Sequence, residues 1–327
     1  MIQKRMTVMM SENLTTARPM FHTTAFTTPE ARLAASRLPM AERQWMIENL
    51  LVEYVTFKEG LDFVRRARNP YDGGTPVGGK LRGFLGESRV GKSWICEHYA
   101  DCNPPEVADD RELYKVIHMT ISVRMSPLEF AQELNEQSGN RFALMRGGWQ
   151  SYVRRALLRL IEVGNELLIL DDAQYLFFDR REDTVYDMFK LVKMILDTRR
   201  TNVLLVGEER TGEFVERTPP LKNRDYSALP FRPLTSSAKD IKDFGTLLGS
   251  IDKRLPFAEP SGLKDLAKDM HRFSGGMIGI VMNVVQAAAA EALNNNRSRV
   301  LIEDFRFAVK TRVRPGDDYD YFGYKPR

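Results

Sequence analysis

The sequence predicts an α/β fold with a five-stranded parallel sheet, preceded by a helical N-terminal segment and followed by a small helical lid. Two patterns indicate this fold. Short apolar runs alternate with helical stretches over residues 77–235, and helical periodicity alone is present in 29–68 and in 236–312. The composition agrees, since 43% hydrophobic and 28% charged residues provide a core and exclude a collagen-like, mucin-like or wholly disordered chain.

The N-terminal part divides into an arm and a helical segment. Residues 1–28 are rich in Thr and Met and lack the apolar centre of a signal peptide, so we expect a flexible polar arm. Helical periodicity then extends over 29–38 and 41–68. Turn-forming residues over 69–76 mark a linker, and 29–76 therefore forms a helical segment with its linker.

The expected sheet domain covers residues 77–235. A strand–helix–strand order predicts parallel strands with helices on both faces of the sheet. The strand candidates are short apolar runs at 81–86, 114–122, 166–171, 202–207 and 228–232. The helix candidates between them cover 91–100, 126–137, 148–164, 184–199 and 210–217.

Helices alone are expected in the lid, over 236–312. The last residues, 313–327, combine aspartates with tyrosines and have no apolar period, so we expect an exposed tail. Such a tail is either a docking peptide for a basic partner or a disordered solubilising end. The lid helix candidates cover 238–251, 262–273, 277–294 and 302–312.

A phosphate-loop pattern follows the first strand candidate. Its glycines let backbone N–H groups surround phosphate oxygens, and the helix that begins within it adds a favourable dipole. Lys92 can reach the β- and γ-phosphates, and the Ser93 hydroxyl can bind Mg²⁺. The motif therefore predicts a site for ATP with Mg²⁺. It consists of Gly86, Glu87, Ser88, Arg89, Val90, Gly91, Lys92 and Ser93.

Two further strand candidates end in acidic residues. The apolar run at 167–170 leads into Asp171 and Asp172. At the carboxyl end of a parallel strand, Asp171 would hold Mg²⁺ and Asp172 would polarise the attacking water as a catalytic base. The run at 202–206 leads into Glu208, which is the candidate sensor of the γ-phosphate; the alternative is that Glu208 or Glu209 caps the next helix.

The order of these motifs resembles that of AAA+ ATPases. More narrowly, roughly residues 41–312 resemble the TniB and TnsC family of ATPase regulators of DNA transposition, with MuB as a more distant relative. The resemblance rests on the loop GFLGESRVGKS with its Asn-Pro lead-in, on LLILDDAQYL, and on LLVGEE. The lid segment FSGGMIGIVMNVVQAAAAEAL completes it.

The resemblance implies an ATPase that assembles as a homo-oligomer, in a ring or a helical filament, around double-stranded DNA. Its implied partners are a transposase and a target selector, which is either a sequence-specific DNA binder or an RNA-guided complex. It also implies an arginine donated in trans to the neighbouring subunit, for which Arg224 matches the position and Arg217 and Lys222 are rivals. An arginine in trans would make hydrolysis depend on assembly.

The sequence departs from related ATPases at two points. Most of them have glutamate where Asp172 stands, and the shorter side chain predicts slow hydrolysis. Many also carry an arginine early in the lid helix at 277–294, whereas the nearest arginine here is Arg272.

A basic stretch marks the expected DNA-binding surface. Between residues 141 and 159 there are five arginines and no acidic residue. This stretch either neutralises DNA phosphates or forms the solvated face of a helix. By the resemblance, Arg124, Arg141 and Arg146 are the candidate DNA contacts, independent of base sequence. Arg154, Arg155 and Arg159 are expected instead to pack between subunits.

Charge and cysteine content restrict the compartment. The formal net charge of +4 is compatible with nucleic acid without demanding it. The two cysteines, Cys96 and Cys102, cannot crosslink a chain of 327 residues, so we expect a bacterial cytoplasm. No apolar run approaches about 18 residues, and we expect no membrane span.

Two other functions fit the same motifs. One is a helicase loader or replication initiator of the AAA+ type, which predicts a sequence-specific DNA-binding module after the lid. The other is a nucleotide-bound scaffold with negligible turnover. ATP hydrolysis measured with and without DNA distinguishes the scaffold from the transposition regulator.

Overall fold

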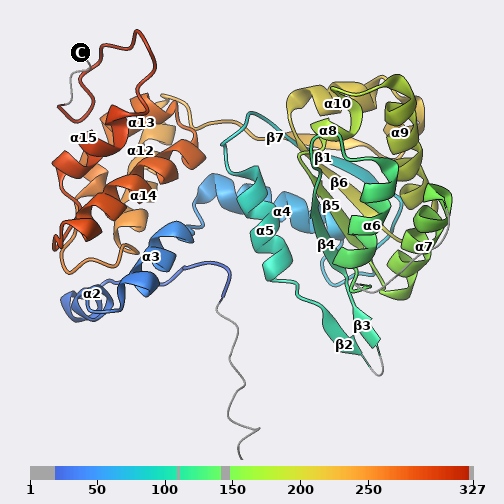
Figure 1. Cartoon of the computed structure of the whole chain (residues 1–327), viewed down its shortest axis with the longest axis horizontal. Coiled ribbons are helices and arrows are strands. Elements are labelled where there is room, and N and C mark those ends of the chain that lie inside the picture. Colours follow the sequence, from blue (N-terminus) through green and yellow to red (C-terminus); the bar gives the residue numbers. More distant parts are fainter. Residues whose placement is uncertain (1–18, 109–110, 141–147, 324–327) are drawn as a thin grey trace, which may run out of the picture.

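The computed structural model describes residues 19–108, 111–140 and 148–323, and it has the predicted α/β fold (Figure 1). The central sheet has five strands in the order β4-β5-β6-β1-β7, and all neighbouring strands are parallel. All five predicted strands are therefore confirmed. They are β1 (Leu81–Leu85), β4 (Val116–Thr120), β5 (Leu167–Asp171), β6 (Asn202–Gly207) and β7 (Ser227–Pro230).

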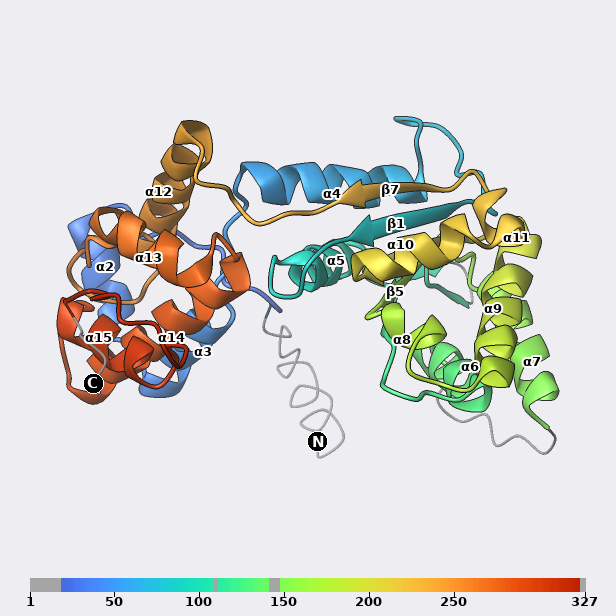
Figure 2. The same cartoon turned by 90° about the horizontal axis from the view of Figure 1, so that it is seen from above.

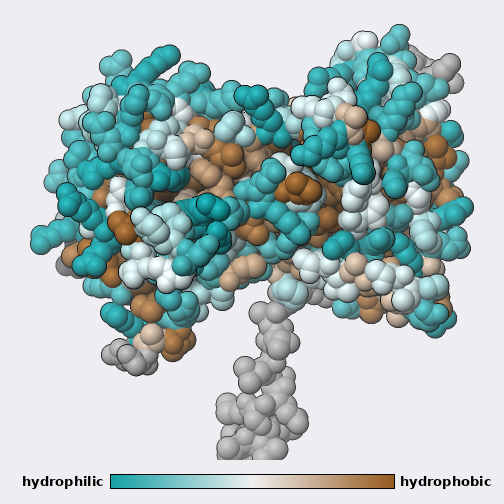
Figure 3. All heavy atoms as spheres, turned by 180° about the vertical axis from the view of Figure 1, so that it is seen from behind, coloured by the Kyte–Doolittle hydropathy of each residue, from teal (hydrophilic) through white to brown (hydrophobic). Residues whose placement is uncertain are grey.

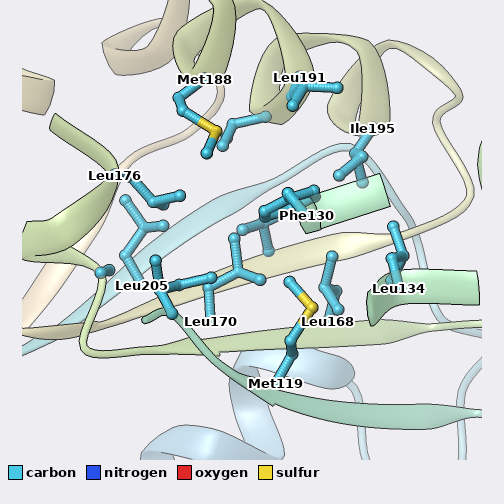
Figure 4. Close-up of a cluster of buried hydrophobic side chains, with 14 of the residues drawn as sticks. Met119, Phe130, Leu134, Leu168, Leu170, Leu176, Met188, Leu191, Ile195 and Leu205 are labelled. Atoms are coloured by element: carbon cyan, nitrogen blue, oxygen red, sulfur yellow. The ribbon is translucent and has the colours of Figure 1, made fainter. Parts of the chain in front are cut away.

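Helices cover both faces of the sheet because successive side chains of its strands point to opposite faces, and both faces are apolar. Leu168 and Leu170 of β5 pack into one cluster, whereas Leu167 and Ile169 pack into another. The second cluster lies under α4 (Val55–Arg68) and α5 (Lys92–Asp101). Figure 4 shows part of the first cluster, in which side chains of α6 (Pro127–Gln137) and α9 (Glu182–Asp197) lie over the strands. The other helices on this side of the molecule are α7 (Trp149–Glu162), α8 (Gln174–Phe177), α10 (Glu209–Glu216) and α11 (Pro219–Lys222).

The lid forms a second body beside the sheet domain (Figure 2). Of the N-terminal segment, α4 packs on the sheet, whereas α2 (Pro29–Ser36) and α3 (Met40–Glu48) pack against the lid, where Ile47 and Leu50 belong to the lid's apolar cluster. Arg32 also lies 3.8 Å from the Asp252 carboxylate of the lid. The other elements of this body are α12 (Ala238–Asp252), η1 (Leu263–Leu266), α13 (Ala267–Ser274), α14 (Ile278–Asn294) and α15 (Ile302–Lys310).

The predicted flexible arm is wrong for residues 19–28, while 1–18 lie outside the described residues. Phe21, His22 and Phe26 are all buried. Phe21 packs its ring 5.2 Å from that of Trp94 on α5, and the Phe26 N–H donates to the Lys253 carbonyl of the lid at 2.6 Å. The segment is ordered because these rings cover apolar surface on both bodies of the molecule.

The predicted exposed tail is wrong for Tyr321 and Phe322, although most other residues of 313–323 are exposed, and residues 324–327 are outside the described part of the chain. Phe322 is 1% exposed and Tyr321 is 4% exposed. The Asp269 carboxylate of the lid accepts hydrogen bonds from the Tyr319 hydroxyl (3.2 Å) and from the Phe322 N–H (2.8 Å). The rings complete the lid core, so Tyr321 and Phe322 are not available as an exposed docking peptide.

Two further differences concern local structure. The helix expected over 41–68 is interrupted, because residues 49–54 are not helical and the Leu51 N–H donates to the His22 carbonyl at 2.9 Å. An antiparallel pair, β2 (Glu106–Ala108) and β3 (Arg111–Leu113), was not predicted and projects beyond the sheet domain (Figure 1). Among the described residues, no helix is long and apolar enough to cross a membrane.

Candidate nucleotide site

A cavity of about 540 Å³ lies between the carboxyl ends of the central strands and the lid. Its volume is in the range of small-molecule sites, about 300–1,000 Å³. Phosphate-loop residues and acidic side chains make up one part of its lining, here called the phosphate end, and mostly apolar side chains of the N-terminal segment and lid make up the rest, here called the apolar end. Figure 3 shows the molecule from behind, with a notch at its upper edge between the two bodies.

The phosphate loop connects β1 to α5, as predicted. A Cβ atom at Gly86 would lie 2.0 Å from the Phe231 carbonyl oxygen, so the loop passes too close to β7's continuation for any side chain. Gly91 has φ 109°, in the left-handed region, and is the N-cap of α5. The two glycines of the motif are therefore required by close approach and by backbone conformation, respectively.

Lys92 is folded into this loop. Its ammonium group donates to the carbonyl oxygens of Gly86 (2.9 Å) and Glu87 (2.7 Å). Burial lowers the pKa of Lys92 below its ordinary value, although the carboxylates of Asp171 and Asp172 act in the opposite direction. The ammonium can exchange these carbonyls for phosphate oxygens. Ser88, Arg89, Gly91 and Ser93 also line the cavity, whereas Val90 is buried beneath the loop.

Asp171 ends β5 and faces the same cavity. It is 4% exposed, and its Oδ1 accepts the Asp172 N–H at 2.9 Å. Burial acts to raise the pKa of Asp171, but the nearby imidazole of His118 and hydroxyl of Ser93 outweigh burial and hold the pKa below its ordinary value. An ionised carboxylate beside a hydroxyl is a hard oxygen donor set, so Asp171 and Ser93 fit the Mg²⁺ of a bound nucleotide.

His118 was not predicted. It lies on β4, and its Nε2 is 3.5 Å from Asp171 Oδ2. His118 lies within a strand and outside any recognised motif, so the sequence does not single it out. The parallel pairing of β4 with β5 brings it close to the Asp171 carboxylate.

Asp172 follows β5 with φ 54°, in the left-handed region. This conformation is uncommon for a residue other than glycine, although aspartate adopts it more readily than most side chains. The Asp172 Oδ1 accepts a hydrogen bond from Gln174 Nε2 at 3.0 Å. The structure thus brings Asp172, Asp171 and Lys92 to one end of one cavity.

Glu208 also lines the cavity. It occupies the N-cap position of α10, but its side chain makes no capping hydrogen bond. Its carboxylate instead lies 2.7 Å from Arg210 Nε, which offsets the negative charge facing the phosphate end. Side-chain capping is therefore wrong as the role of Glu208, and a sensor role stays a prediction.

The apolar end of the cavity was missed in the sequence. Residues 50–57 supply Leu51, Tyr54 and Phe57. Burial raises the pKa of the Tyr54 hydroxyl far above its ordinary value. The lid contributes Leu247, Ile251, Ile278, Gly279, Met282, Asn283 and Gln286. Some of the lid residues stand in the lid segment that carries the family resemblance, but nothing in that segment indicates a cavity, and three distant segments have to meet before they form a site.

The lid touches the phosphate loop directly. The Gly279 N–H donates to the Arg89 carbonyl at 2.8 Å, and a Cβ at Gly279 would lie 2.8 Å from that oxygen. Arg272, the nearest lid arginine, does not line the cavity, because its guanidinium stacks 4.0 Å from the centre of the Tyr319 ring.

The remaining predicted residues lie elsewhere. The Arg224 guanidinium pairs with Asp197, and its carbonyl accepts the Leu81 N–H at the amino end of β1. Arg124 is exposed after β4, whereas Arg141 and Arg146 lie outside the described residues. Arg159 donates a hydrogen bond at 2.9 Å to the carbonyl of Ser138, the C-cap residue of α6.

Comparison with known proteins agrees with the fold. The sequence profile of an AAA domain family matches residues 84–213, which include the phosphate loop, the acidic strand and the strand before Glu208. The chain has an AAA+ fold. A comparison with curated protein sequences found no match.

Several solved structures share this fold at low sequence identity. Cdc6p from Pyrobaculum aerophilum is 17% identical with a TM-score of 0.56, over 80% of this chain and 67% of that one. The ORC2 protein of Aeropyrum pernix, in ADPNP and ADP complexes, is 13% identical with a TM-score of 0.57, over 78% and 67%. The ORC1 protein of Aeropyrum pernix, in complex with DNA, is 17% identical with a TM-score of 0.54, over 77% and 64%. The chain thus spans about two thirds of their length.

Proposed function

We propose that the protein is an ATP-dependent, DNA-binding regulator of transposition. It assembles as a homo-oligomer on target duplex DNA, connects a target selector to the transposase, and disassembles when ATP is hydrolysed. The observation that carries the ATPase part is the convergence of Lys92, Asp171 and Asp172 on one cavity with an apolar far end. The transposition part rests on the resemblance to the TniB and TnsC regulators.

The proposed chemistry is hydrolysis of ATP to ADP and phosphate. Lys92 would bind the phosphates, and Ser93 with Asp171 would hold Mg²⁺, which would supply positive charge beside the transferred group. Asp172 orients the attacking water and accepts its proton. Arg224 of a neighbouring subunit would complete the site. Arg217 remains a rival, because its side chain is 83% exposed and lies 4.0 Å from Glu213, whereas Arg224 is 24% exposed and paired.

The proposed DNA contact is electrostatic. Arg124 is exposed and no partner for its side chain is present in the described part of the chain, so it is available for a phosphate. Binding through such contacts is independent of sequence and weakens steeply with salt.

We predict that Arg124→Ala lowers affinity for any duplex and reduces the slope of log affinity against log salt by about one. Arg37→Ala is the matched control, because Arg37 is an exposed arginine at the end of α2, on the other body. Fluorescence anisotropy on random duplexes at several salt concentrations measures both variants. An unchanged slope for Arg124→Ala would remove this residue from the DNA surface.

A replication initiator or helicase loader is the second candidate function. It is favoured by the fold shared with Cdc6p and the ORC proteins. Binding preference decides between the two, because an initiator is expected to select one duplex sequence and a transposition regulator is not. A transposase gene with transposon end repeats beside this gene would favour the regulator.

The decisive experiment combines turnover and recruitment. ATP hydrolysis is measured with and without duplex DNA, and capture of the transposase on DNA-bound protein is measured with ATP and with ADP. We expect DNA to stimulate hydrolysis and ATP to be required for capture. Absence of turnover under both conditions would favour a nucleotide-bound scaffold.

A further inference from the structure

We propose that Gln174 is a positioning residue for the Asp172 carboxylate, and that its side-chain amide couples the acidic strand β5 to the neighbouring strand β6. This inference rests on ATP hydrolysis as the proposed function. Gln174 begins α8 and lines the cavity, yet it is only 4% exposed. A buried amide needs partners for both its donor and its acceptor.

The two partners of Gln174 belong to different strands. Its Nε2 donates to Asp172 Oδ1 at 3.0 Å, just after β5. Its Oε1 accepts the Glu208 N–H, at 3.4 Å, just after β6. An ionised carboxylate can only accept a hydrogen bond and a backbone N–H can only donate one. A flipped amide would therefore place Oε1 against the Asp172 carboxylate and Nε2 against the Glu208 N–H, and neither pair could form a hydrogen bond. The partners therefore fix one orientation.

Gly207 makes room for this amide. A Cβ atom at Gly207 would lie 2.4 Å from Gln174 Oε1. The backbone reinforces the same connection, because the Ala173 N–H donates to the Val206 carbonyl at 2.8 Å. The φ angle of Gly207 lies outside the left-handed region, so its backbone conformation does not require glycine. The close approach of the Gln174 amide does require it.

The hydrogen bond leaves half of the Asp172 carboxylate free for water. Gln174 occupies Oδ1, and Oδ2 has no hydrogen-bond partner within the residues that the structure describes. Asp172 carries one methylene fewer than the glutamate common in related ATPases, so the direction of its short side chain decides where Oδ2 points. Fixing that direction matters, since a displacement of about 1 Å at a reacting group can cost roughly a hundredfold in rate.

Three substitutions test the link in different ways. Gln174→Met keeps the length of the side chain and removes both hydrogen bonds. Gln174→Glu keeps the acceptor toward Glu208 and places a second carboxylate against Asp172. Gly207→Ala leaves Gln174 in place and pushes its amide aside. Each variant is expected to lower kcat for ATP hydrolysis by about tenfold to a hundredfold, with KM and the Kd of a fluorescent ATP analogue within about twofold of wild type.

Gln137→Met is the matched control. Gln137 makes the same kind of bond, from Nε2 to Glu133 Oε1 at 2.8 Å, on the exposed side of α6. Its loss is expected to leave kcat unchanged. The double variant Gln174→Met/Gly207→Ala should turn over no more slowly than the worse single variant, because both changes break one link. Thermal unfolding of all variants accompanies the kinetics.

A kcat for Gln174→Met within about twofold of wild type, with ATP bound normally, would overturn the assignment. Equal losses of kcat and ATP affinity would also overturn it, because they indicate a collapsed site. If Gln174→Met does not fold, Gly207→Ala and Gln174→Glu decide by the same criteria. A wild-type chain that binds ATP without ever hydrolysing it contradicts the proposed ATPase and this inference together, whereas turnover insensitive to these variants contradicts this inference alone.

Discussion

The two ends of the cavity are built in different ways. The phosphate end is made of the loop between β1 and α5, the pair Asp171–Asp172 after β5, and Glu208 after β6, whose backbones are fixed by the sheet. The apolar end is made of short pieces of the N-terminal segment and of the lid helices α12 and α14. Charge recognition thus depends on single side chains, whereas the apolar end depends on the way two bodies of the molecule pack together.

This difference between the two ends predicts that single substitutions change ATP binding or hydrolysis strongly at the phosphate end and weakly at the apolar end. The largest concerns turnover. Asp172→Asn is expected to retain binding of ATP and Mg²⁺ but to lower hydrolysis by about 10²- to 10⁴-fold, since the amide cannot accept the proton of water. The variant should remain assembled on DNA with ATP, which a sedimentation assay measures beside the phosphate-release rate.

Asp318→Asn is the control for this change, because Asp318 is an exposed aspartate in the segment that follows α15.

Asp171→Asn should behave differently from Asp172→Asn and weaken nucleotide binding that depends on Mg²⁺. Wild-type rates in both Asp171→Asn and Asp172→Asn would mean that the acidic strand is only structural.

The second effect concerns binding of the phosphates. Lys92→Ala is expected to lower ATP affinity by at least about 3 kcal/mol, or roughly a hundredfold, because it removes the motif's side-chain cation. Titration calorimetry with ATP and with inorganic triphosphate should show the same loss for both ligands. Lys58→Ala, on the exposed side of α4, is the control. Normal affinity in Lys92→Ala would contradict the phosphate-loop assignment.

The third effect concerns the contact between the two ends. Gly279→Val places a Cβ 2.8 Å from the Arg89 carbonyl oxygen and should push the lid away from the phosphate loop. Overpacking of this kind costs about 1–3 kcal/mol, so ATP affinity should fall by about tenfold. Gly249→Val is matched to it, because no heavy atom lies within 4 Å of a Cβ at Gly249. Equal ATP affinity in the two variants would show that the lid contact does not contribute.

The smallest effect is expected at the apolar end itself. Met282→Ala removes one of several apolar side chains of the cavity and should weaken ATP binding by about 1 kcal/mol, or a few-fold. Affinity for inorganic triphosphate should stay unchanged, in contrast to Lys92→Ala. Met194→Ala, at an exposed position of α9, is the control. Equal losses for ATP and triphosphate in Met282→Ala would erase the distinction between the two ends.

Packing explains where the sequence misled about the chain termini. Residues 19–28 and 313–323 have no periodicity of their own, which is why they were expected to be a flexible arm and an exposed tail. Phe21 and Phe322 are nevertheless buried, each against apolar surface from a distant part of the chain. When the hydrophobic residues of a segment follow no helix or strand period, its burial can be recognised only once the surface that covers it is known.

The sequence by itself determined the five strands of the central sheet, their parallel arrangement and the phosphate end of the cavity. It could do so because strand periodicity is local and because the glycines, Lys92 and the carboxylates stand within two short motifs. The tertiary structure alone decided the apolar end, the pairing of His118 with Asp171, and the amide of Gln174 between Asp172 and Glu208. Those contacts join residues from different strands and bodies, and their distances follow from sheet order and lid packing, which no spacing along the chain records.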